Sequence, residues 1–194
     1  MHRTNRLPRF FFAGLLLLAA CGSESNQQST ASTQTDLTSS ESSFNDADVM
    51  FAQMMIPHHE QAIELADIAL DPTLMASEQV KTLASQIKLA QDPEIDLMTQ
   101  WLTDWDQPLM DMSEEHDMSM DGMLSVDEIA ALGQLVGEEF DQAWASAMIA
   151  HHKGAIKMAK TVKEDGKSTP VQDLANLIVQ EQQSEITFLE TLLG

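Results

Sequence analysis

The sequence predicts an all-α protein, a four-helix bundle made from two copies of one helical hairpin. Apolar residues recur at steps of three and four along four long segments, which is the spacing of one helix face. No segment alternates apolar and polar residues with period two, so strands are not expected. The segments MMIPHHEQAIELA at 54–66 and SAMIAHHKGAIKMA at 146–159 carry the same histidine pair in the same apolar frame. Such an internal repeat predicts one structural unit used twice.

The first hairpin is expected at about 46–70 and 77–105. Asn45 or Asp46 can cap its first helix, and Leu70-Asp71-Pro72 ends that helix. Pro57 has no amide hydrogen to donate, so a kink is expected just before the histidine pair. The apolar stripes are Phe51, Met55, His58, Ala62, Leu65 and Ala69 in the first helix, and Val80, Ala84, Ile87, Gln91, Glu94, Met98, Trp101 and Trp105 in the second.

The second hairpin is expected at about 138–164 and 170–192, with a stop and restart at 164–170. Its histidines follow those of the first hairpin at an offset of 93 residues, and Gln182 and Glu185 follow Gln91 and Glu94 at an offset of 91. The small change of offset falls in the connecting loops. Two hairpins packed together give a bundle with pseudo-twofold symmetry.

The segment between the hairpins is expected to be a linker followed by a short helix. Residues 106–124 contain proline and glycine and show no periodicity. Ser125 and Glu128 form the pattern of a capping box, which predicts a helix that begins there and that Gly137 interrupts.

The N-terminus predicts export and lipid anchoring. Residues 1–20 combine three arginines with an apolar run of 11 residues at 10–20, which is typical of a signal peptide and too short to span a membrane. Leu18-Ala19-Ala20-Cys21 resembles the bacterial lipobox, with cleavage before Cys21 and lipid on its sulfur. Residues 21–44 are rich in Ser, Thr and Gln and are expected to form a disordered tether. This leaves one domain at 45–194, held in the bacterial cell envelope and facing the periplasm or the exterior.

The charge balance argues for a cation as partner. The formal net charge is −21, and residues 1–20 hold three of the ten basic residues and none of the 31 acidic ones. A chain this acidic is not expected to bind nucleic acid, or an anionic lipid surface beyond its anchor. Cys21 is the single cysteine, so its lipidation leaves no thiol for disulfide or thiolate–metal chemistry.

The paired histidines predict a metal site inside the bundle. Adjacent helical residues point about 100° apart, so one histidine of each pair faces the bundle axis and the other a neighbouring helix. Imidazole and thioether suit copper, and thioether favours Cu(I), with Ag(I) as its surrogate. The candidate ligands in the helices are Met54, Met55, His58, His59, Glu94, Met148, His151, His152 and Glu185. The alternative is that these histidines only satisfy hydrogen bonds in the core and that the methionines only pack.

The linker PLMDMSEEHDMSMDGM at 108–123 offers a second set of soft ligands. Met112, His116, Met118 and Met120 are its candidates, and the alternative is a plain acidic surface loop. Residues 117–128 also match a calcium-binding EF-hand loop, with Asp117, Ser119, Asp121 and Glu128 at ligand positions. No clear helix precedes that loop, and the capping box explains Glu128 equally well.

With these motifs in hand, residues 45–194 resemble the domain-of-unknown-function family 305, the CopM-like copper-binding proteins. The resemblance lies in MMIPHHEQAIELA, QDPEIDLMTQWLTDW, GMLSVDEIAAL and FDQAWASAMIAHHKGAIKMA. It implies a ferritin-like helical bundle, an extracytoplasmic location and, for some members, binding of Cu(I) or Ag(I) in metal tolerance. Carried over, it singles out Met55, His58, His59, Met148, His151 and His152. The Glu-x-x-His signature of di-iron ferritin-like enzymes is missing from the sequence.

Three functions therefore stay open at the level of sequence. The first is a lipid-anchored binder or carrier of copper, which buffers it, confers tolerance or transfers it. The second is a ferritin-like metal oxidase, and the third is a structural or signalling lipoprotein with core histidines. No nucleophile, general base or phosphate-binding loop favours an enzyme, and no motif identifies a protein that delivers or accepts copper.

Overall fold

The computed structural model describes residues 43–110 and 120–194, and in these ranges the chain is all-α, as predicted. Cys21, Met112, His116, Asp117, Met118 and Ser119 lie outside the described residues, and so do the expected signal peptide and tether. Five α-helices and one short 3₁₀ helix make up the described part, without a strand. They are α1 (Asp46–Leu70), η1 (Pro72–Leu74), α2 (Glu78–Asp104), α3 (Val126–Leu132), α4 (Gly137–Asp165) and α5 (Thr169–Leu193). None of the described helices is long and apolar enough to cross a membrane.

The helix starts follow the capping residues. The Asn45 side chain accepts from the Asp48 amide at 3.1 Å, and the Asp48 carboxylate accepts from the Asn45 amide at 2.9 Å. Ser77 caps α2, and Ser125 with Glu128 forms the expected capping box on α3. At each of these three helix starts, one amide that lacks a partner within the helix therefore donates to a side chain close in sequence.

Two details differ from the sequence prediction. Pro72–Leu74 forms a 3₁₀ turn, because the Asp71 side chain accepts from the Thr73 amide at 2.8 Å. Helix α3 ends at Leu132, and Gly137 is the first residue of α4 rather than an interruption of α3. Gly137 has φ of +61°, which glycine adopts without strain. Both α1 and α2 remain helical through their prolines, Pro57 and Pro93.

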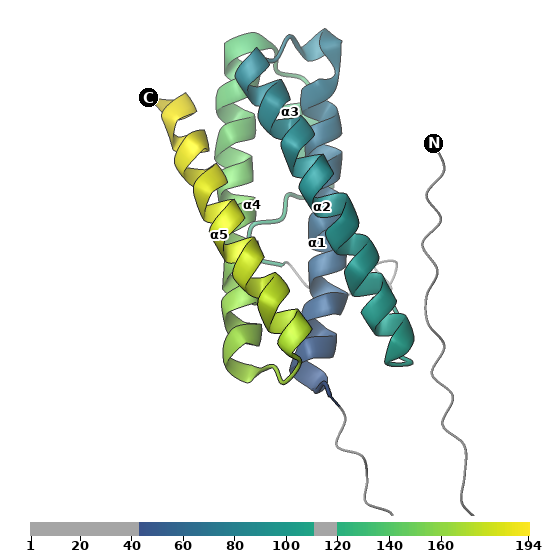
Figure 1. Ribbon diagram of the computed structural model, residues 1–194. Coiled ribbons are helices and arrows are strands. Elements are labelled where there is room, and N and C mark those ends of the chain that lie inside the picture. The colour runs from purple at the N-terminus through teal and green to yellow at the C-terminus, as the bar shows by residue number, and fades with distance from the viewer. Residues whose placement is uncertain (1–42, 111–119) are drawn as a thin grey trace, which may run out of the picture. The chain divides into compact units, whose positions relative to one another are not determined.

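The helices form two hairpins that meet through α1 and α4. Helix α1 packs along α2, and α4 packs along α5, while the main contact between the hairpins joins α1 to α4. Figure 1 shows α1 and α4 running side by side, with α2 and α5 crossing in front of them. The chain therefore places the two repeat segments, 54–66 and 146–159, on adjacent helices.

Buried polar residues divide the apolar core in two. One apolar cluster gathers around Leu65, Trp144 and Phe140, where the Trp144 indole N–H donates to the Leu65 carbonyl at 2.8 Å. The other gathers around Phe51, Met98 and residues of α5. Between these clusters in sequence, on all four long helices, lie the buried side chains of His58, His59, Gln91, Glu94, His151, His152 and Gln182. We call this set, together with the partly exposed Glu185, the polar layer.

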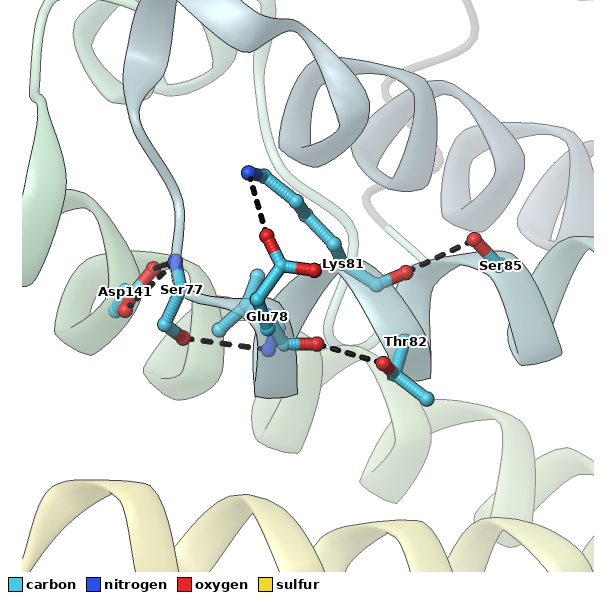
Figure 2. A network of polar contacts seen from close by, with 7 residues as sticks. Ser77, Glu78, Lys81, Thr82, Ser85 and Asp141 are labelled. Carbon is cyan, nitrogen blue, oxygen red and sulfur yellow. Dashed lines mark hydrogen bonds and ion pairs between the residues drawn. The ribbon is translucent and has the colours of Figure 1, made fainter.

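Polar contacts at both ends of the molecule fix the loops of the hairpins. At one end the buried Asp48 carboxylate accepts from the amides of Lys167 and Ser168, both at 3.0 Å, which ties the α4–α5 loop to the start of α1. At the other end the Ser77 amide donates to the Asp141 carboxylate of α4 at 3.1 Å (Figure 2). These contacts hold each hairpin loop against the opposite hairpin, so the register of the polar layer is set from both ends.

Candidate metal centre

The centre of the polar layer is a contact between two imidazoles from different hairpins. His58 of α1 and His151 of α4 have ring centroids 3.8 Å apart and ring planes inclined by 40°. Both residues occupy the first position of their histidine pair, so the repeat places equivalent side chains against each other. One imidazole of each pair thus points across the interface between the hairpins, as the sequence predicts.

The second histidine of each pair points into its own hairpin. His59 Nε2–H donates to Glu94 Oε2 of α2 at 2.8 Å, which requires the tautomer with the proton on Nε2, because a carboxylate only accepts. His152 Nε2 lies 2.7 Å from Glu185 Oε2 of α5, although this ion-pair contact lacks the geometry of a hydrogen bond. The hairpins therefore repeat the same histidine–glutamate pairing, with better alignment in the first.

The four imidazoles are shut away from solvent and carry unpaired nitrogens. Their exposed fractions are 1% or less. The Nδ1 atoms of all four histidines, and also Nε2 of His151, have neither a hydrogen-bond partner nor an ion-pair partner. A buried polar atom without a partner costs about 1–3 kcal/mol. Five such nitrogens in one layer are therefore costly for the metal-free fold.

The environment keeps the central imidazoles neutral. Burial lowers the pKa of His58 from 6.5 to about 3, with a further contribution from the charge of His59. Burial also lowers the pKa of His151 well below 6.5, and the charges of His58 and His152 lower it further. A neutral imidazole keeps the lone pair that binds a metal ion. Both central histidines are thus held in the ligating form at neutral pH.

Side chains of α2 and α5 surround the outer histidines. Gln91 and Gln182 are buried, and their side-chain oxygens have no partner. Burial raises the pKa of Glu181, and the negative charges of Glu94 and Glu185 raise it further. The carboxylates of α2 and α5 therefore gather beside His59 and His152 and add negative potential there.

The end of the linker covers the His58 side of the layer. We call Met120–Leu124 the strap. The Gln61 side chain makes two hydrogen bonds to the Leu124 backbone, both at 2.8 Å, and His58 Nε2–H donates to the Asp121 carbonyl at 3.4 Å. The strap packs directly against Gly154 of α4. A Cβ at this position would collide with the Asp121 carbonyl, so only glycine allows this close approach. These contacts were not evident from the sequence, since nothing in the helical pattern marks Gln61 or Gly154 as a partner of a segment far away in the chain.

The structure separates the methionine candidates. Met55 and Met148 are fully buried in the two apolar clusters and pack as core residues. Met54 and Met120 instead line a pocket between α1, α4 and the strap. Among the described residues, no three His, Cys, Asp or Glu side chains are arranged to hold a metal ion. The layer thus presents pairs of donors rather than a cage.

The described part of the calcium motif is engaged in other contacts. The Glu128 carboxylate accepts from the Ser125 amide and hydroxyl at 2.8 Å, which confirms the capping-box alternative. The Asp121 carboxylate pairs with Lys157 of α4. Since these carboxylates already have partners, the described geometry gives no support to a calcium loop.

Comparison with known proteins identifies the family. The family model described as "Domain of unknown function (DUF305)" matches residues 48–193. The chain belongs to the DUF305 family. A search among proteins of curated function finds no match.

Several DUF305 structures share the fold. A DUF305 fragment from Deinococcus radiodurans is 34% identical with a TM-score of 0.68, covering 77% of this chain and 97% of the fragment. A candidate secreted DUF305 protein from Streptomyces coelicolor is 32% identical with a TM-score of 0.67, covering 76% of this chain and 91% of that protein. CopM in its Cu(II)-bound form is 30% identical with a TM-score of 0.64, covering 75% of this chain and 95% of CopM. CopM has also been solved with Cu(I) and with Ag bound.

The depressed pKa of His58 predicts that acid destabilises the metal-free protein. Between pH 6.5 and about 3 the unfolded chain binds a proton at this histidine and the folded chain does not, so stability falls as pH falls. The contribution of one such group is at most about 1.4 kcal/mol per pH unit. Urea unfolding of the metal-free protein from pH 7.5 to 5 should therefore show a steeper loss of stability than unfolding of His58→Gln. Equal slopes in the two proteins would contradict the burial of a neutral His58.

Proposed function

We propose that this protein binds a soft monovalent ion, Cu(I) or Ag(I), between its two hairpins. The observation that carries the proposal is the contact between His58 and His151, whose tilted rings are buried and neutral and have unpaired nitrogens. An ion bound by these nitrogens would supply the partners that the metal-free fold lacks. His59 and His152 add two more unpaired nitrogens in the same layer.

The donor set favours a monovalent ion over zinc. Structural zinc sites are almost always tetrahedral, with four protein ligands, and the described residues present no group of three candidate ligands. Cu(I) and Ag(I) are d¹⁰ ions that accept two ligands in a line, and two imidazoles can provide these ligands if their ring nitrogens turn toward the same ion. The neutral state of both imidazoles leaves the charge of the ion to be balanced by the carboxylates of α2 and α5.

Glu94 and Glu185 act on the ion through the histidines in this proposal. A hydrogen bond from His59 Nε2–H to Glu94 directs the lone pair to Nδ1, which is the buried nitrogen without a partner. Metal-bound histidines commonly donate their second ring nitrogen to a carboxylate in this way, which fixes the tautomer and raises the basicity of the ligand.

The related proteins support copper as the bound ion and the cell envelope as the location of the protein. One structure of CopM holds Cu(I), and others hold Ag or Cu(II). We therefore propose a carrier or buffer of copper on a ferritin-like four-helix bundle, anchored through lipid on Cys21 and facing the periplasm or the exterior. Met112, His116 and Met118 of the linker are proposed as further, weaker ligands.

Competition for ions tests the proposed site. The protein with Cys21→Ser, which removes the thiol, should retain Cu(I) in preference to Zn(II) under reducing conditions. Replacing His58, His59, His151 and His152 with Ala should abolish the tightest class of Cu(I) binding. The control replaces Met110, Met112, Met118, Met120 and Met123 with Leu, which keeps side-chain volume and should lower stoichiometry alone. A tight class that survives without the four histidines, or better retention of Zn(II), would show that the imidazoles are structural.

Anchoring is tested at Cys21. In the intact bacterial cell, Cys21→Ser should release the protein from membranes or leave an uncleaved precursor, because the serine hydroxyl cannot replace the thiol that receives the lipid. Detergent partitioning and the N-terminal sequence of the mature protein measure the outcome. If both are unchanged in the variant, Cys21 is not the anchor.

A further inference from the structure

We infer that a methionine-lined pocket beside the polar layer is a second binding site for soft ions, from which Cu(I) reaches the imidazoles. The inference rests on the proposed function of the histidines, which it extends by a separate thioether site. The pocket has a volume of about 510 Å³ and opens between α1, α4 and the strap. Four methionines line it, namely Met50 and Met54 of α1, Met120 of the strap and Met158 of α4.

These methionines differ from the methionines of the core. Met55, Met98 and Met148 are fully buried and fill the apolar clusters. Met50 is 59% exposed although it lines the pocket, and Met50 and Met54 lie one helical turn apart on the same face of α1. Core packing does not account for an exposed methionine beside an open space. Thioethers from three separate segments around one cavity instead provide the soft donors that select Cu(I).

The pocket and the imidazole site share a wall. Asp121 and Gly154 line the pocket, and the Asp121 carbonyl accepts from His58 Nε2. A Cβ added at Gly154 would lie 3.1 Å from His58 Nε2. Gly154 and the Asp121 carbonyl therefore lie against both the pocket and the His58 imidazole, and loss of the long 3.4 Å contact between Asp121 and His58 would free His58 Nε2 on this side.

The charges at the pocket favour a cation. Asp46, Asp121 and Asp165 line it together with one basic residue, Lys157, which is paired with Asp121. The unbalanced carboxylates attract a cation to the opening, while the thioethers discriminate for a soft ion over calcium or magnesium. Sulfur ligands without charge hold the ion less firmly than buried imidazoles backed by carboxylates, so transfer runs from the pocket to the polar layer.

Methionine methyl NMR during titration with Ag(I) tests this site, using the chain with Cys21→Ser and methionines labelled at the methyl carbon. The methyl signals of Met50, Met54, Met120 and Met158 should shift, and that of Met75, which is 62% exposed outside the pocket, should not. The same shifts should persist in the variant His58→Ala/His151→Ala. The proposal of a separate site would be overturned if the methyl signals of the pocket methionines do not shift while Ag(I) binds. It would also be overturned if they shift only when both histidines are present.

Loading kinetics test the transfer. Met50→Leu/Met54→Leu/Met158→Leu should load the tightest Cu(I) class about tenfold more slowly, because the pocket no longer concentrates the ion beside His58. The final affinity of that class should stay unchanged, and Met75→Leu is the matched control. Unchanged loading in the triple variant would overturn transfer from the pocket. The two proposals can fail separately. If the tightest Cu(I) class survives loss of the histidines, the proposed function is wrong, but the methyl shifts of the pocket methionines still show whether the pocket binds an ion.

Discussion

The contact between His58 and His151 is the feature on which the arrangement of the molecule depends. It joins the two hairpins at the α1–α4 interface, in a layer that separates two apolar clusters. Apolar side chains of similar volume would stabilise this layer more, since each unpaired buried polar atom costs about 1–3 kcal/mol. A natural protein that keeps such a cost in its core commonly does so for function. In the proposed function, an ion between the hairpins supplies the interactions that these unpaired nitrogens lack.

The two halves of the site are equivalent in sequence but not in environment. Each hairpin supplies a central histidine, an outer histidine and a glutamate at matching positions. The strap breaks the symmetry, because it gives His58 Nε2 a carbonyl acceptor and leaves both nitrogens of His151 unpaired. The pocket lies on the same side as the strap. The His58 imidazole therefore has a carbonyl partner from a residue that lines the pocket, whereas the His151 imidazole has none, so the two central histidines are not equivalent.

Much of this fold and part of the site could be predicted from the sequence. The caps at Asn45 and Ser125 are local patterns, and so is the helical period that turns one histidine of each pair toward a neighbouring helix. The contacts of the strap could not be predicted in this way, because Gly154 and Asp121 meet through the packing of distant segments. The same limit applies to the methionines. Met55 and Met148 precede the histidine pairs in the two repeat segments and are buried in the core, whereas Met50, which precedes the first segment, and Met158, near the end of the second, line the pocket.

X-ray absorption at the copper edge tests the central claim most directly. The chain with Cys21→Ser would be loaded with less than one equivalent of Cu(I), so that the tightest site alone is filled. The first coordination shell should then consist of nitrogen, with the outer-shell scattering of imidazole rings, and this signature should disappear when His58 and His151 are replaced with Ala. A first shell made of sulfur at the same loading would contradict the account, because it would place the tightest site among the methionines and leave the facing imidazoles as part of the core.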